Sequence, residues 1–146
     1  MALLLGVLVA AKADQEAPRL FEDLPGATYH TCGCDFRRLE GSTEGGGKAV
    51  FSSDGEGSAV VLVGGKVVAL SGKKPDKKCW PSRVGGRCVM EYVAKGYQVL
   101  LRLRATWVCP SGDEGESCEV VRLQGDFVGK ANAQEEKFKV AGECGC

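Results

Sequence analysis

The sequence predicts an all-β domain, built as a small antiparallel barrel or sandwich of about eight strands with disulfides. Three observations predict this class. Short apolar runs alternate with polar residues at a period of two, which is the period of a half-buried strand. The 146 residues include 21 glycines, and glycine-rich clusters separate the runs as tight turns would. The eight cysteines form an even set, which is typical of disulfides in an exported chain.

The first residues, 1–13 (MALLLGVLVAAKA), predict a signal peptide. Their apolar run is too short to span a bilayer as a helix, and Ala11-Lys12-Ala13 fits the small-x-small pattern of a cleavage site. A buried N-terminal segment is the alternative. Because no cysteine sits at the cleavage point to carry a lipid, we expect no membrane anchor after cleavage and a secreted or periplasmic location.

The chain after the leader divides into an extended or loosely attached segment, 14–27, and a single β-domain, 28–146. Within the domain, alternation and turn composition delimit the strands. The expected strands are 29–39, 48–52, 58–63, 66–70, 87–93, 97–109, 118–128 and 137–146.

The strands of the first half are bounded by turns. Strand 29–39 presents Cys34 and Phe36 on one face, and a glycine-rich loop separates it from the short strand 48–52. After an Asp- and Gly-rich turn, two apolar runs flank Gly64-Gly65. They predict a hairpin, since a glycine pair can adopt the positive φ angles that a two-residue turn needs.

The second half contains the longest alternation. Strand 97–109 follows 87–93 across a tight turn, and its apolar side chains occupy the odd positions. Trp107 is one of them, so we expect it in the core. Strand 118–128 alternates in the same way. The residues 129–136 predict a turn or frayed loop, and 131–137 could form a helix of a turn or two at most.

Four cysteines fall into two pairs with equal spacing. Cys79 and Cys88 flank one polar loop, with eight residues between them. Cys109 and Cys118 flank another loop at the same spacing. Each pair could therefore close the base of its loop with a disulfide, although spacing alone cannot select one pairing among all eight cysteines.

The other four cysteines form two identical tripeptides, Cys32-Gly33-Cys34 and Cys144-Gly145-Cys146. In extended backbone, residues two apart point to the same face, so both sulfurs of each tripeptide project together. We expect two bridges joining the first tripeptide to the last, since closing some 110 residues stabilises by about 4.8 kcal/mol against about 2.7 for a ten-residue loop. The alternative is a metal site in which Cys32, Cys34, Cys144 and Cys146 supply four thiolates to Zn²⁺ or Cu⁺. An oxidising compartment argues against it, and no cofactor is expected.

Other groups give no enzymatic signature. His30 is the only histidine and has no partner motif for catalysis, so we expect a protein that is not an enzyme. Basic and acidic residues balance at 19 each, so no strong net charge attracts nucleic acid, and we expect no nucleic-acid partner. The acidic and basic clusters are expected to be solvated loops, and they are Asp113, Glu114, Glu116 and Glu119, and Lys73, Lys74, Lys77 and Lys78.

Several short motifs resemble an uncharacterised family of small exported bacterial proteins that end in a Cys-Gly-Cys tripeptide. They are Cys32-Gly33-Cys34-Asp35-Phe36, the stretch 50–57, Val108-Cys109-Pro110, the stretch 116–120 and the closing 142–146. This resemblance implies export and disulfides, and it implies no mechanism.

A looser resemblance is to the membrane-bound C-type lysozyme inhibitors, which are small periplasmic β-barrels. The stretch 58–70 is similar to the central hairpin of these inhibitors. The stretch 83–87 lies where the inhibitors carry an inhibitory loop. This resemblance implies that the loop from Ser82 to Arg87 enters a hydrolase cleft, where Arg83 or Arg87 meets catalytic carboxylates. Our main expectation is an exported structural or binding domain, with a protein of the cell envelope as its possible partner. Hydrolase inhibition and metal binding are the alternatives.

Overall fold

The computed structural model describes residues 19–26, 32–39, 47–73, 80–110 and 119–145. These ranges contain nine strands and no helix, and the nine strands belong to one antiparallel sheet. None of these ranges contains a helix that could cross a membrane. The strands are β1 (Phe21–Glu22), β2 (Gly33–Arg38), β3 (Phe51–Ser53), β4 (Ser58–Val63), β5 (Lys66–Gly72), β6 (Arg87–Ala94), β7 (Tyr97–Val108), β8 (Val120–Ala131) and β9 (Gln134–Gly145).

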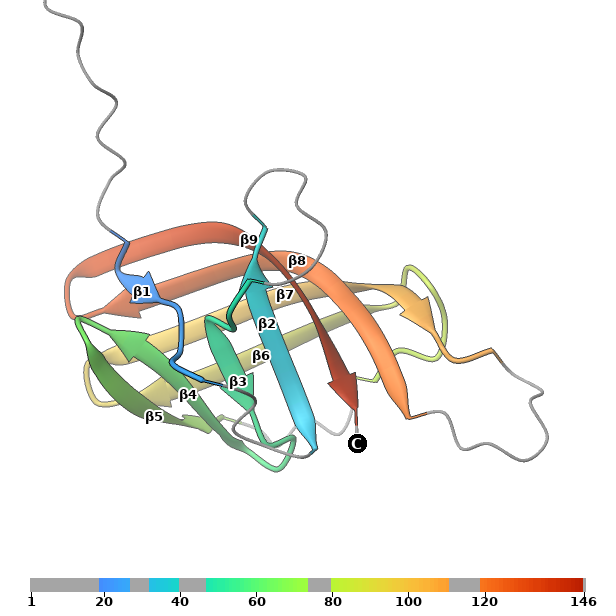
Figure 1. Cartoon of the computed structure of the whole chain (residues 1–146), viewed down its shortest axis with the longest axis horizontal. Helices are drawn as coiled ribbons and strands as arrows, with labels where there is room; N and C mark the ends of the chain where they lie inside the picture. Colours follow the sequence, from blue (N-terminus) through green and yellow to red (C-terminus); the bar gives the residue numbers. More distant parts are fainter. Residues whose placement is uncertain (1–18, 27–31, 40–46, 74–79, 111–118, 146) are drawn as a thin grey trace, which may run out of the picture.

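Strands β2 to β9 form a closed eight-stranded barrel (Figure 1). Each strand pairs with its neighbour in the sequence, and β2 pairs with β9 to close the ring. The prediction of an all-β fold with about eight strands is confirmed, and closure selects the barrel over the sandwich. The predicted hairpin of β4 and β5 is present, with positive φ at both Gly64 and Gly65.

The extra strand β1 belongs to the expected N-terminal segment, 14–27, and is docked on the barrel. Strand β5 pairs with the whole length of β4, so β1 and β3 share the opposite edge of β4. β3 pairs with Ala59 and Val60, and β1 pairs with Leu62 and Val63. β1 therefore continues the barrel wall beyond the short strand β3.

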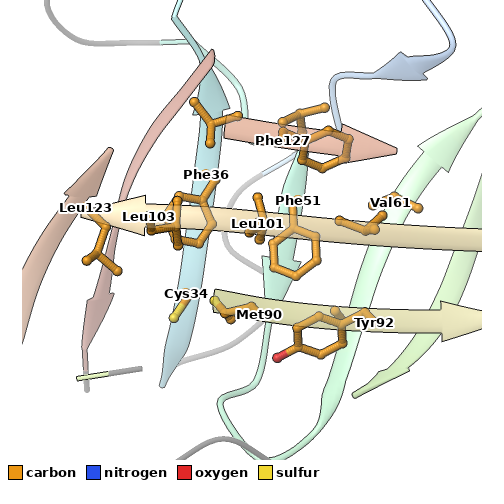
Figure 2. Packing of buried hydrophobic residues seen from close by; sticks show 14 of the residues in the cluster. Cys34, Phe36, Phe51, Val61, Met90, Tyr92, Leu101, Leu103, Leu123 and Phe127 are labelled. Carbon is orange, nitrogen blue, oxygen red and sulfur yellow. The ribbon is translucent and has the colours of Figure 1, made fainter. Parts of the chain in front are cut away.

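Every strand sends side chains into the interior, where they pack into one apolar cluster (Figure 2). Aromatic rings dominate it. The Phe51 ring meets Tyr92 edge to face at 5.2 Å between centroids, and Phe21 meets Phe127 in the same way at 5.1 Å. Such pairs add about 0.5–1.5 kcal/mol to the free energy gained by burial. The barrel is therefore a packed core and not a channel.

The expected turn or frayed loop at 129–136 is confirmed only as a turn of two residues, and its extent is wrong. Strand β8 continues to Ala131, Asn132 and Ala133 form a two-residue turn, and β9 begins at Gln134. The turn contains no glycine, and Asn132 supplies the positive φ of 55° instead. Gly129 lies inside the strand, where the sequence pattern suggested that the strand had ended.

Trp107 lies outside the barrel, so the expectation that it belongs to the core is also wrong. The β7–β8 register shifts between Ala105 and Trp107, which makes Thr106 an extra residue in a β-bulge. The alternation inverts there. Ala105 is buried, Trp107 is 38% exposed, and Val108 packs against the core.

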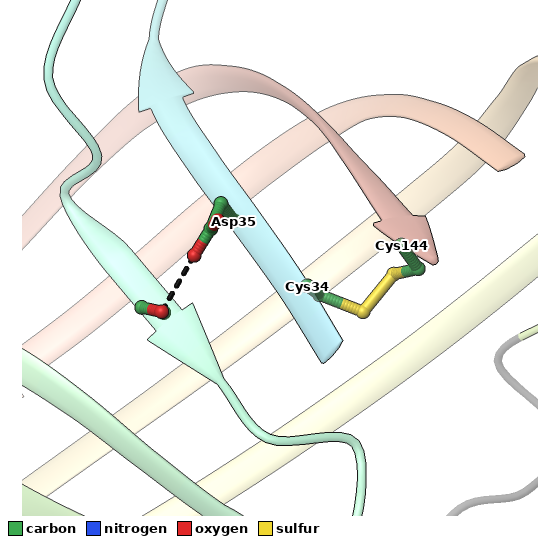
Figure 3. Close-up of a disulfide and its surroundings, with 4 residues drawn as sticks. Cys34, Asp35 and Cys144 are labelled. Carbon is green, nitrogen blue, oxygen red and sulfur yellow. Dashed lines mark hydrogen bonds between the residues drawn. A yellow bond between two sulfur atoms is a disulfide. The ribbon is translucent and has the colours of Figure 1, made fainter. Parts of the chain in front are cut away.

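A disulfide joins the two strands that close the barrel. Cys34 of β2 and Cys144 of β9 are directly opposite one another and are bonded, across a sequence separation of 110 (Figure 3). This confirms one of the two bridges expected between the tripeptides. Cys32, Cys88 and Cys109 are also disulfide-bonded, and no cysteine of the described ranges is free. Their expected partners, Cys79, Cys118 and Cys146, lie outside the described residues.

Candidate functional site

An open groove of about 440 Å³ runs over the outer wall of the barrel, across strands β6 to β9. Its polar lining comes from side chains that alternate with the core residues of these strands. It is lined by Leu39, Arg87, Arg102, Leu103, Arg104, Gln124, Gly125, Asp126 and Lys139. Four of these nine residues are cations and one is an anion.

The register of two hairpin strands brings the arginines of the groove together. Arg87 of β6 lies directly opposite Arg104 of β7. Arg102 lies two residues from Arg104 and so projects on the same face of β7. Like charges directly opposite one another in an antiparallel pair are destabilising. Within the described ranges, no ion pair or side-chain hydrogen bond engages any of the three guanidinium groups.

The one carboxylate of the groove is already engaged. Asp126 of β8 lies opposite Arg102 on one side and opposite Lys139 on the other. Its Oδ1 atom forms an ion pair with the Lys139 ammonium group. Arg87, Arg102 and Arg104 are exposed, and none of them forms an ion pair with a described residue.

Gly125 holds the strands of the groove close together. A Cβ atom at this position would lie 1.9 Å from the carbonyl oxygen of Arg102, so only glycine fits. The close approach of β8 fixes the backbone that carries Arg102.

The bulge adds an aromatic ring beyond the arginine cluster. Trp107 and Arg122 are paired in register, and the Arg122 guanidinium carbon lies 5.5 Å from the Trp107 ring centroid. This is cation–π geometry. Along the outer face of β7, the order is therefore Arg102, Arg104 and then Trp107.

The stretch singled out in the sequence forms a braced turn. Gly86 N–H donates to the Arg83 carbonyl at 3.0 Å, and Gly85 N–H donates to the Ala105 carbonyl at 2.8 Å. Ser82 and Arg83 are exposed and do not line the groove, whereas Arg87 does. The structure therefore separates the three expected residues.

Sequence reasoning missed Arg102 and Arg104. Both lie on the polar face of the expected strand 97–109, and counting back from the tight turn before that strand places Arg87 opposite Arg104. The hairpin register is thus the signal that could have found the cluster.

A second charged group lies on β6. Glu91 Oε1 accepts hydrogen bonds from Lys73 Nζ at 3.0 Å and Gln98 Nε2 at 2.8 Å. The bond from Lys73, followed by that from Gln98, lowers the pKa of Glu91 below its ordinary value of 4.5. Lys73 is thus engaged within the sheet and is not a free member of the expected basic loop.

The metal alternative meets a chemical obstacle, because the sulfurs of Cys32, Cys34 and Cys144 are in disulfides and are not thiolates. The described ranges contain no group of three side chains that could hold a metal ion. Cys146, His30, most of the acidic cluster and three of the four lysines lie outside those ranges.

Fold and site together define the class of protein: a disulfide-bonded, closed antiparallel barrel with one extra strand and a cationic groove on its wall. No protein-family model, no curated protein and no solved structure matches the chain.

Proposed function

We propose that the protein is a non-catalytic binding domain whose outer groove takes a ligand bearing carboxylate, sulfate or phosphate groups. The observation that carries the proposal is the cluster of three guanidinium groups on adjacent strands, at Arg87, Arg102 and Arg104, which form no ion pair with any residue that the structure describes. A cluster of like charges lowers the stability of the empty barrel. An anionic ligand would relieve that repulsion when it binds.

The chemistry of the groove suits planar or tetrahedral oxyanions. A guanidinium group offers a fork of N–H donors that matches a carboxylate or a phosphate with two parallel hydrogen bonds. The Gln124 amide adds neutral donors beside them. The groove lies on strands that are hydrogen-bonded on both sides, so its geometry is set before the ligand arrives.

The test is a binding titration with three defined probes: heparin, poly-glutamate and polyphosphate. We expect binding of at least one probe, weakened by salt. A variant with Arg87, Arg102 and Arg104 all changed to alanine should bind it about 100-fold more weakly, since each exposed charge contact contributes about 1 kcal/mol. The matched control changes Lys48, Lys66 and Lys95, which are exposed on other parts of the barrel, and should bind within threefold of wild type. Equal losses in the two variants, or no binding of any probe, would refute the groove.

A second candidate, inhibition of a lysozyme-like hydrolase, is favoured by the braced turn before β6. Backbone hydrogen bonds to Ala105 hold this turn, and its Val84 side chain is 62% exposed. A rigid projecting loop suits insertion into a cleft because little entropy is lost when it binds. The assay is lysozyme inhibition by the intact protein. Arg83→Ala should weaken inhibition at least tenfold while Arg102→Ala leaves it unchanged, and absence of inhibition by the intact protein ends this candidate.

We further propose that the chain works in an oxidising compartment outside the cytoplasm. The Cys34–Cys144 bridge supports this because disulfides persist in such compartments. Intact mass of the exported protein, measured with and without reduction, should report removal of residues 1–13 and four bridges. An uncleaved leader with eight titratable thiols would contradict this location.

A further inference from the structure

The side of the barrel next to β1 contains a slot that is filled by the chain's own N-terminal segment. The ring of β2 to β9 closes without β1, yet the Phe21 side chain is fully buried. Its ring lies over Gly129, where a Cβ atom would be 2.2 Å from the ring. Gly129 therefore makes the space that Phe21 occupies.

A nearly buried ion pair holds the main chain of Phe21. The Phe21 N–H donates to Glu136 Oε1 at 3.0 Å, and Arg38 Nη2 donates to the Phe21 carbonyl at 2.5 Å. Arg38 also bonds Glu136 at 2.7 Å and lies 3.5 Å from the Phe138 ring centroid. The pair thus satisfies both backbone groups of Phe21 through side chains. The opposite edge of the segment pairs with β4, as an extended peptide does when it adds a strand to a sheet.

Two further contacts hold the segment after Phe21. Glu22 Oε1 accepts the N–H of Gly65 at 3.0 Å. The Leu24 side chain is 1% exposed, and its N–H donates to the Ala49 carbonyl at 2.7 Å. The slot therefore selects an aromatic residue, an acid and, two positions later, an aliphatic residue.

We propose that this slot is a peptide-acceptor site and that residues 21–24 of a second copy of the chain can occupy it. Eight residues separate Leu24 from Gly33 at the start of the ring, and fully extended they reach roughly 30 Å. A released segment can therefore cross to a neighbouring barrel. Exchange keeps every contact of the slot and replaces only the chain that supplies it, which makes it a low-cost route to a dimer.

The test uses two full-length variants that complement each other. Phe21→Ala leaves the slot empty and has no aromatic ring to donate. In Gly129→Ala the added methyl group would lie 2.2 Å from the Phe21 ring and 2.7 Å from the Phe127 ring. The Phe21 segment is therefore displaced and free to donate, and the Phe127 ring must also shift. Mixed at equal concentration, the two should form a 1:1 heterodimer by native mass spectrometry, while each alone stays a monomer. Heterodimer formation should be lost when the donor also carries Phe21→Ala.

A peptide of residues 19–26 (RLFEDLPG) provides an independent measurement on the Phe21→Ala protein. It should bind at least tenfold more tightly than the same peptide with Phe21→Ala. If a variant does not fold alone, the two are refolded together, and a folded fraction should appear only as the 1:1 dimer. Absence of the heterodimer after both mixing and co-refolding overturns the exchange, and absence of peptide binding as well overturns the acceptor site.

Discussion

Replacing one arginine of the groove should stabilise the barrel while weakening anion binding. In Arg104→Gln, the side chain keeps its place and hydrogen-bonding capacity opposite Arg87 but loses its charge. Directly opposed cross-strand pairs contribute about 0.2–1 kcal/mol, and Arg102 on the same face adds repulsion in the wild type. We therefore expect a gain of about 0.5–1 kcal/mol in the free energy of unfolding, or a rise in Tm of roughly 2–4 °C.

The assay is thermal unfolding at low and high salt, together with the anion titration. Because salt screens exposed charges, added salt should stabilise wild type more than Arg104→Gln, and the two melting temperatures should converge. The matched control, Lys66→Gln, removes one exposed charge far from the arginines and should change Tm by less than about 1 °C. A lower Tm for Arg104→Gln, or a gain that persists at high salt, would refute the claim that the cluster is electrostatically strained.

Three further outcomes test other parts of the structure. Changing Cys34 and Cys144 to serine should lower the free energy of unfolding in urea by less than the roughly 2–4 kcal/mol typical of a single bridge, because the second bridge expected between the tripeptides keeps the loop closed, and a reductant should abolish the difference from wild type. Because the pKa of Glu91 is lower in the folded protein, its contribution to stability is present above pH 4.5 and is lost as pH falls through the folded pKa. Glu91→Gln should therefore flatten this part of the acid unfolding curve. An NMR titration midpoint for Glu91 at or above 4.5 would contradict the lowered pKa. Trp107 fluorescence should be quenched by acrylamide in the native state, whereas protection would place Trp107 in the core. The measurement uses a variant with Trp80 changed to phenylalanine, so that Trp107 is the single tryptophan.

Much of the fold could be predicted because the period-two pattern and the turn residues agree. The hairpin of β4 and β5 has both signals, an apolar run on each side and Gly64-Gly65 between them, and its bounds match closely. The pattern failed where a local feature inverted it. The bulge at Thr106 moved Trp107 to the outer face, and Gly129 continued a strand because the Phe21 ring fills the space of its missing side chain.

The candidate site was only partly accessible from the sequence. Arg87 was identified from its loop, but its partners come from the next strand, and their proximity depends on register rather than on spacing along the chain. The slot for β1 was harder to predict. Gly129 and Glu136 face one another in the β8–β9 hairpin, but Arg38 reaches Glu136 only once β2 has paired with β9.

The bridge between Cys34 and Cys144 also bears on how the barrel forms. Every strand pairing in the ring joins strands that are adjacent in the sequence, except the β2–β9 seam, where the ring closes. All the other pairings can therefore form between segments that are close in the sequence. The seam demands a meeting of residues 110 positions apart, which is the slow and entropically costly event in such a topology. Once the disulfide has formed, Cys34 and Cys144 stay joined even in the unfolded chain. Refolding then requires only that the hairpins between these two residues form again.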